Sequence, residues 1–213
     1  MGQEPLVSII IPTIGRTASL ERCLESVRRN TTVPYEIVLV IPKSVALPVK
    51  LLEECTLVYE EEPTGCVRAY NKGLRVARGK YLAHLNDDCE PCPSWIDNML
   101  ALIGNRKVLG AFYFKEPDDK DFHTNSLWGK LYANFTFASR ELFEEMNFFD
   151  DVNFKHFGFD PDFSLSVWHA GYEVVATPDA RVIHYRVEDE HRQEHLREIA
   201  STNLYKKWKG IFC

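Results

Sequence analysis

Runs of β-branched and other apolar residues alternate with helical patterns through the first part of this chain. Leu6 to Ile11 is a continuous apolar run, which is typical of a strand buried on both faces of a sheet. Thr17 or Ser19 can cap the helix that follows, and Tyr35 to Ile41 is a second apolar run. Strands and helices joined by short connections indicate parallel βαβ units. We therefore predict an α/β fold in which residues 1–90 form a half-sheet of the nucleotide-binding type.

The rest of the chain continues the alternation of strand and helix patterns. In the first half the patterns predict a strand at Leu57–Tyr59, a helix over 66–78 and a strand at Lys80–Leu85. In the second half they predict helices at Trp95–Ile103, Arg140–Met146 and Asp160–Ala170. They predict strands at Val108–Phe114, Phe135–Ala138, Tyr172–Ala176 and Arg181–Tyr185. The chain should end in a charged helix with Leu196, Ile199 and Leu204 on its buried face. Residues 115–132 are charged and are predicted to form a long loop.

A cluster of polar residues follows the strand predicted at Lys80–Leu85. Asn86, Asp87 and Asp88 stand there in succession. In open α/β sheets ligands bind at the carboxyl ends of the strands, and adjacent carboxylates repel each other unless a cation neutralises them. Because hard oxygen ligands suit Mg²⁺ or Mn²⁺, the segment predicts a divalent metal site. A strand followed by an ordinary Asn–Asp turn is the alternative.

Composition limits the class of protein. The chain has 213 residues and a formal net charge of −6, so it lacks the basic surplus expected of a protein whose main partner is nucleic acid. No apolar run approaches the roughly 20 residues that span a bilayer, and no signal peptide pattern precedes the first strand, so we expect a cytoplasmic protein. The 6 cysteines are too sparse for a disulfide scaffold, and Cys89 and Cys92 are interpreted as incidental thiols beside the metal strand.

Several segments resemble, in the right order, motifs of the family 2 inverting glycosyltransferases with the GT-A fold. They are Val7–Thr13, similar to the opening strand; Gly65–Gly73, similar to the next helix; Lys80–Asp88, similar to the strand with the DXD motif; and Gly158–Phe163, followed by Ala170–Tyr172, similar to the segment with the catalytic base. The resemblance implies a Rossmann-like, mostly parallel sheet flanked by helices, with a smaller acceptor-side subregion. It also implies a single domain over 1–213, whose second half, 91–213, binds the acceptor and supplies the base.

The resemblance implies transfer of a hexose from a UDP-sugar to a glycan or glycoprotein hydroxyl, with inversion and by direct displacement. Asp88 would bind Mn²⁺ or Mg²⁺ between the donor phosphates, and Asp87 would hydrogen-bond the ribose. His184 matches a histidine that completes the metal site in several members, although a core or surface histidine is the alternative. Asn86 stands in place of the usual first acid and lowers the negative charge around the cation.

Asp160 is the expected general base, which would take the proton from the acceptor hydroxyl as its oxygen attacks the anomeric carbon. The residue before it is Phe159 in place of the family's Glu, and an apolar neighbour raises the pKa of a carboxyl group by desolvation. Asp162 is the rival candidate for this role. Either acid is also explained as a favourable charge at a helix N-terminus.

The remaining expected donor contacts come from two segments. Pro12, Thr13 and Arg16 follow the first strand and would line the uracil and phosphate pocket. Arg68 and Lys72 lie one helical turn apart and would meet the base and the diphosphate, unless they belong to a solvated basic face. The family's acid at the end of the second strand is absent, because Val40-Ile41-Pro42 occupies that position.

We thus predict a metal-dependent glycosyltransferase that uses UDP-glucose or a related UDP-hexose. The chain is short for the family, which is consistent with the catalytic domain of a longer polypeptide. It also resembles compact virus-encoded members, which would act in the host cytoplasm. Two alternatives stay open: a sugar nucleotidyltransferase, and a non-catalytic module that binds sugar nucleotides or glycans.

Overall fold

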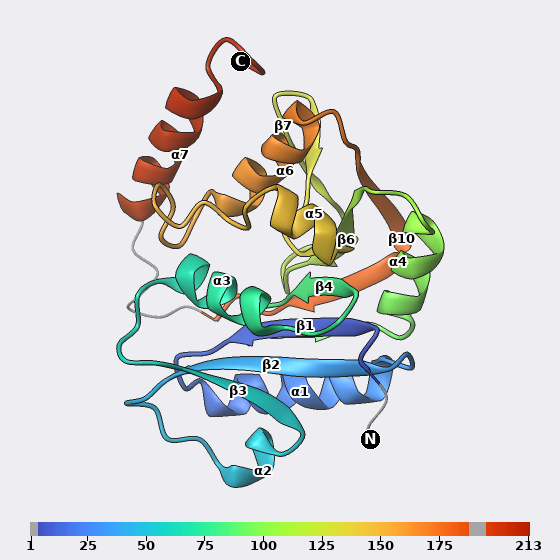
Figure 1. The fold of residues 1–213 in the computed structure, drawn as a ribbon, viewed down its shortest axis with the longest axis vertical. Coiled ribbons are helices and arrows are strands. Elements are labelled where there is room, and N and C mark those ends of the chain that lie inside the picture. Colours follow the sequence, from blue (N-terminus) through green and yellow to red (C-terminus); the bar gives the residue numbers. More distant parts are fainter. Residues whose placement is uncertain (1–3, 188–194) are drawn as a thin grey trace.

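The computed structural model describes residues 4–187 and 195–213 and shows a mixed α/β fold (Figure 1). Its elements are β1 (Val7–Pro12), α1 (Thr17–Asn30), β2 (Tyr35–Pro42), α2 (Val49–Leu52), β3 (Cys55–Glu60), α3 (Cys66–Val76), β4 (Tyr81–His84), β5 (Cys89–Pro91), α4 (Trp95–Ile103), β6 (Leu109–Lys115), β7 (Asn125–Leu127), β8 (Lys130–Tyr132), β9 (Thr136–Ser139), α5 (Arg140–Glu145), α6 (Phe159–His169), β10 (Val174–His184) and α7 (His195–Trp208). The predicted alternation of strands and helices is confirmed on both sides of residue 90, and the structure adds α2, β5, β7 and β8, which the sequence patterns did not predict.

The central sheet has the strand order β3-β2-β1-β4-β9-β6-β10-β5. Strands β1 to β4 are parallel to one another, and β6 is parallel to β10. The short strand β9 runs antiparallel to both β4 and β6, so these two groups of strands point the same way. The carboxyl ends of β1, β3, β4, β6 and β10 therefore meet at one edge of the sheet, as does the start of β9.

Two apolar layers enclose the sheet. Successive residues of β1 alternate between them, with Ile9 and Ile11 in one cluster and Ile10 in the other. Helices α1 and α4 supply the first layer, whereas α3, α5, α6 and α7 supply the second. Because both faces are covered, β1 and β2 are apolar except for Ser8 and Glu36, which explains the hydrophobic runs in the sequence.

The structure corrects the prediction of a long loop over 115–132. That segment contains a two-stranded hairpin in which β7 pairs with β8. The connecting residues Trp128 and Gly129 both have positive φ, 49° and 75°, as a tight two-residue hairpin requires. The hairpin lies outside the main sheet, so its strands carry polar side chains and lack the apolar run that predicts a buried strand. The two strands predicted at 172–176 and 181–185 are one strand, β10, with an irregularity between Thr177 and Arg181.

The buried face of α7 also differs from the prediction. Ile199 is 53% exposed, whereas Ala200, Leu204 and Trp208 are buried at a spacing of four residues. The side chain of Leu196 lies outside the described residues. The indole Nε1 of Trp208 donates to Asp162 of α6, so this polar contact helps to set which face of α7 turns inward.

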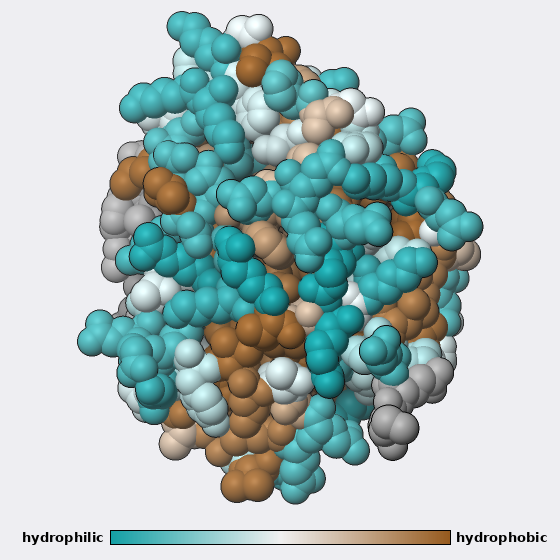
Figure 2. Space-filling model, in the orientation of Figure 1, coloured by the Kyte–Doolittle hydropathy of each residue, from teal (hydrophilic) through white to brown (hydrophobic). Residues whose placement is uncertain are grey.

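The surface is mostly hydrophilic on the face drawn in Figure 2, with an apolar area in its lower half near α2 and β3. Val49 of α2 and Tyr59 of β3 are exposed hydrophobic residues in these elements. Within the described residues, no helix combines the length and the apolar character that crossing a membrane requires.

The contact between α3 and the sheet yields a stability prediction. A Cβ at Gly73 would lie 2.5 Å from Ile10 Cγ2 and 3.0 Å from Val40 Cγ2, both in buried side chains. Helix propensity favours alanine over glycine by about 1 kcal/mol, but overpacking a core costs about 1–3 kcal/mol. We expect Gly73→Ala to lower the unfolding free energy measured in urea. Val76→Ala, on the exposed side of the same helix, is the control and should change it by less than about 0.5 kcal/mol. An unchanged or higher stability in Gly73→Ala would contradict this packing.

Candidate active site

A cavity of about 680 Å³ opens at the carboxyl edge of the sheet. Its walls come from the residues that follow β1, β4, β6 and β10, from the end of β3, from the segment that enters β9, and from the starts of α3 and α6. Such an edge is the usual ligand position in open α/β sheets. The predicted residues that line it are Pro12, Thr13, Arg16, Asn86, Asp87, Asp88, Asp160 and His184.

Arg68 and Lys72 are the predicted residues that the structure does not bring into the cavity. Arg68 is exposed on α3, and Lys72 Nζ lies 2.8 Å from Oε1 of Glu60 at the end of β3. The two side chains do share a helical surface, as expected. The ion pair with Glu60 holds Lys72 against the outer side of the cavity wall.

Asp87 is held by the loop that follows β1. Its side chain accepts hydrogen bonds from Thr13 Oγ1 at 2.7 Å and from Arg16 Nη1 at 3.1 Å, and the residue is only 4% exposed. Burial raises the pKa of Asp87, although the Thr13 hydroxyl and the Arg16 guanidinium oppose that rise. This contact fixes the Pro12–Arg16 segment over the end of β4.

Asp88 is stabilised from the other side, by the end of β10. Oδ1 lies 3.3 Å from His184 Nε2, and Oδ2 accepts a hydrogen bond from the backbone N–H of Val187 at 3.0 Å. Burial alone would raise the pKa of Asp88, but His184, the Val187 amide and Arg16 outweigh it and lower this pKa below its usual value. Asp88 is therefore the more readily ionised of the two adjacent acids.

The ring of His184 is oriented by three polar neighbours. Nδ1 lies 3.3 Å from a carboxylate oxygen of Glu116, while Nε2 lies 3.3 Å from the Asn86 amide Nδ2 as well as from Asp88. Each ring nitrogen faces a carboxylate oxygen, so a protonated ring donates to both Asp88 and Glu116, which agrees with the lowered pKa of Asp88. A cation at Nε2 would replace the proton there and leave the Nδ1 proton directed to Glu116, which is the arrangement of a metal-binding histidine with a carboxylate behind it.

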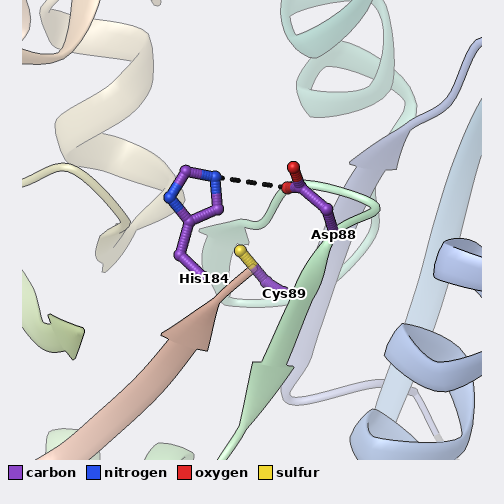
Figure 3. Close-up of side chains that lie close together, drawn as sticks. All are labelled: Asp88, Cys89 and His184. Carbon is purple, nitrogen blue, oxygen red and sulfur yellow. Dashed lines mark ion pairs between the residues drawn. The ribbon is translucent and has the colours of Figure 1, made fainter. Parts of the chain in front are cut away.

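Asp88, His184 and Cys89 together form a candidate cation site (Figure 3). One ligand atom from each lies within 4.8 Å of the others, and the imidazole and carboxylate are turned toward each other. Asp88 Oδ1 is buried and accepts no well-directed hydrogen bond from the described residues. Burial and the adjacent carboxylate of Asp88 raise the pKa of the Cys89 thiol, so the hard oxygen and the imidazole remain as the ligands that suit Mn²⁺ or Mg²⁺. The residues present thus fit a divalent cation.

Asp160 faces the same cavity from the first turn of α6. Gly158 precedes the helix with φ 82°, and the side chain of Phe159 is buried. The Asn134 amide Nδ2 donates to Asp160 Oδ2 at 2.9 Å. Burial raises the pKa of Asp160 to about 7, while the Asn134 amide opposes that rise. A carboxyl group with this pKa can accept a proton near neutral pH.

Asp162, the rival acid, lies outside the cavity. It is 1% exposed, and its two oxygens are taken by Trp208 Nε1 and Lys207 Nζ, each at 2.8 Å. Asp162 therefore joins α6 to α7.

Sequence reasoning missed several polar residues of the cavity. Glu116 supports His184, Asn134 supports Asp160, and the Tyr70 hydroxyl donates to Asn86 Oδ1. Glu60 and Asn125 also line the cavity. Glu116 and Asn134 lie next to predicted strands, and this position was a usable signal. Ligand-binding residues commonly lie at the carboxyl edge of an α/β sheet.

Most of the chain that builds this cavity matches a known protein family. Residues 8–159, the larger part of the chain, match the family described as glycosyl transferase family 2. The chain belongs to this family. The matched region includes the β1 loop, α3, Asn86–Asp88 and the first residue of α6.

A relative and two solved structures illustrate the family assignment and the fold. The uncharacterized glycosyltransferase YwdF of Bacillus subtilis (strain 168) is 30% identical over 206 residues, covering 84% of this chain and 73% of YwdF. The mannosyltransferase PcManGT of Pyrobaculum calidifontis, solved with GDP-Man and Mn²⁺, has a TM-score of 0.70 at 19% identity, covering 97% of this chain and 64% of that one. TarS of S. aureus with UDP-GlcNAc has a TM-score of 0.69 at 13% identity, covering 96% and 73%.

These likenesses confirm the GT-A fold for this family 2 chain. The chain spans only 43% and 37% of the length of two further curated relatives. None of the proteins named here is viral, so the predicted likeness to virus-encoded members has no support.

The candidate cation site yields a binding prediction that does not depend on turnover. We expect Mn²⁺ to raise the melting temperature of the wild-type protein, because a ligand that binds the native state stabilises it. Asp88→Asn should remove most of this rise, since it deletes the charged ligand, and His184→Ala should reduce it. Asp118→Asn removes an equal charge from an exposed position and should keep the full rise. The same Mn²⁺ shift in all four proteins would exclude this site.

Proposed function

We propose that this chain transfers a hexose from a UDP-sugar, UDP-glucose or a related UDP-hexose, to a hydroxyl group of a glycan or glycoprotein acceptor. The observation that carries the proposal is that one cavity is lined both by the candidate cation site at Asp88 and His184 and by Asp160. A leaving-group site and a base in one cavity are what a single direct displacement with inversion requires.

The donor would lie along the first half of the chain, residues 1–90. Thr13 and Arg16 hold Asp87 in place, which leaves the edge of its carboxylate to accept hydrogen bonds from ribose hydroxyls. Pro12 and Thr13 would form the floor under the nucleoside. Arg16 also lies 3.9 Å from Asp88 and adds positive charge beside the expected diphosphate.

Asp88 and His184 would hold Mn²⁺ or Mg²⁺, with Glu116 and Asn86 orienting the imidazole. When bound, such a cation neutralises charge on the departing diphosphate, a contribution of several kcal/mol to the transition state. Asn86 leaves Asp88 as the one carboxylate among these side chains that contacts the cation site. We therefore expect the donor's own phosphates to complete the coordination.

Asp160 would act as the general base for the acceptor hydroxyl. Asn134 fixes one oxygen of its carboxylate, so the other can face the hydroxyl. Such a base contributes typically ~10²–10⁴-fold to the rate. The second half of the chain, 91–213, would thus supply the acceptor side of the reaction, with the β7–β8 hairpin and the start of α6 next to the incoming hydroxyl.

The alternatives from the sequence make different predictions. A sugar nucleotidyltransferase would need a glycine-rich basic loop after β1, and Pro12–Arg16 contains one Gly and one Arg. A module that only binds sugar nucleotides needs no base, yet Asp160 lines the cavity with a pKa raised to about 7. Release of UDP from UDP-sugars in the presence of Mn²⁺ separates the transferase from the binding module.

The base assignment predicts the behaviour of Asp160→Asn. This change should abolish transfer, because an amide cannot accept the proton, while the dissociation constant of the UDP-sugar stays within a few-fold of wild type. Isothermal titration and a coupled assay for UDP release measure the two quantities. Asp179→Asn, which changes an exposed acid of β10 that does not line the cavity, is the control and should keep full turnover. Wild-type turnover in Asp160→Asn would rule out Asp160 as the base.

The pH dependence follows from the same group. Burial raises the pKa of Asp160 to about 7, so the carboxyl is protonated below that pH and kcat/KM should fall as pH decreases through about 7. Asn134→Ala removes a hydrogen bond that stabilises the ionised form of Asp160. In this variant the acidic limb of the kcat/KM profile should therefore move to higher pH. Donor affinity is measured over the same range to separate this limb from ionisation at Asp88 and His184. A flat profile from about pH 5.5 to 8.5, a window of roughly 1.5 units on each side of the expected pKa, would contradict the assignment.

A further inference from the structure

Glu60 is a buried carboxylate in the cavity wall that has no part in the proposed mechanism. It is the last residue of β3, is 4% exposed, and lines the cavity. A buried acid is costly unless it is paired or hydrogen-bonded. Its contacts and its position relative to Asp87 and Asp88 indicate what it can bind.

Within the described residues, the side-chain hydrogen bonds of Glu60 are all made by one carboxylate oxygen. Oε1 accepts from Lys72 Nζ at 2.8 Å and from Thr64 Oγ1 at 3.1 Å. No hydrogen bond from the described residues reaches Oε2. The carboxylate is therefore fixed in orientation, while one of its oxygens remains available to a molecule in the cavity.

Glu60 lies at the opposite end of the cavity edge from the candidate cation site. The strand order β3-β2-β1-β4 puts three strand spacings between them, about 14 Å at ~4.8 Å per spacing. In register, Glu60 pairs with Pro42 at the end of β2, which offers no polar side chain. This separation is comparable to the length of an extended nucleoside diphosphate. A donor whose diphosphate lies at Asp88 and whose ribose lies at Asp87 brings its base toward Glu60.

We propose that Glu60 selects the base of the donor, by accepting a hydrogen bond from a ring N–H on the base's pairing edge. Uracil N3–H and guanine N1–H are such donors, whereas cytosine N3 and adenine N1 present lone pairs at the corresponding position. A carboxylate oxygen opposite a lone pair is repelled and loses its solvation without compensation. Lys72 then acts indirectly, by holding Glu60. This inference rests on the proposed function, and it adds a residue that determines base specificity.

The test is the affinity of the full chain for UDP, GDP, CDP and ADP, each with Mn²⁺, by isothermal titration. We expect UDP or GDP to bind at least about tenfold more tightly than both CDP and ADP. The comparison of UDP with GDP then identifies which of the two bases with a ring N–H is preferred. Glu60→Gln presents both an N–H donor and a carbonyl acceptor, so the preference of UDP over CDP should fall to within about threefold.

One variant serves as a matched control. Glu61→Gln changes the next acid, which is exposed and pairs with Lys43, and should keep the wild-type preference. If Glu60→Gln does not fold, Glu60→Asp withdraws the carboxylate by one methylene and should weaken UDP binding without improving CDP binding.

The outcomes separate this inference from the proposed function. Equal affinity of wild type for all the nucleotides, or an unchanged preference in a folded Glu60→Gln or Glu60→Asp protein, overturns the role of Glu60 while leaving sugar-nucleotide binding intact. If no nucleoside diphosphate binds to wild type, the inference and the proposed function fail together.

Discussion

Two adjacent carboxylates can be buried at the edge of a sheet only if each has its own source of hydrogen bonds or positive charge. Asp87 and Asp88 meet this condition through opposite sides of the fold: Thr13 and Arg16 come from the first strand and its loop, and His184 and the Val187 amide come from the last strand. The pKa of Asp87 is raised and that of Asp88 is lowered, so the pair is differentiated by its surroundings. The two halves of the chain are thereby joined at the cavity.

Much of the fold and part of the site were predictable because they follow local rules. Continuous apolar runs predicted the buried strands. Thr13 follows β1 directly, and Asp87 and Asp88 come shortly after the end of β4. Glu60 and Asn134 were missed although they lie at strand ends, because their roles depend on tertiary contacts with Lys72 and Asp160. Lys72 was placed on the correct helix surface, but only the tertiary contact with Glu60 determines where its charge goes. The β7–β8 hairpin escaped prediction because it packs outside the sheet whose alternation the patterns describe.

The first turn of α6 carries two acids with different surroundings. Asp160 and Asp162 are two residues apart and so about 200° apart around the helix. Asp160 faces the cavity and interacts with Asn134, while Asp162 faces α7 and is held by Lys207 and Trp208. The resemblance favoured Asp160 over Asp162, but both acids suit a helix N-terminus, so their different surroundings could not be read from the sequence. The bonds made by Asp162 fix the rotation of α6, which in turn aims Asp160 at the cavity.

Strand β9 is antiparallel to its neighbours, so it contributes its beginning, not its end, to the functional edge. The chain enters it from the β7–β8 hairpin, and Asn134 accepts from Asn125 of that hairpin while donating to Asp160. Asp160 is thus anchored near the foot of the hairpin, while the Trp128-Gly129 turn lies at the other end. A change in the length or sequence of the hairpin tip would therefore leave in place the amide that holds Asp160.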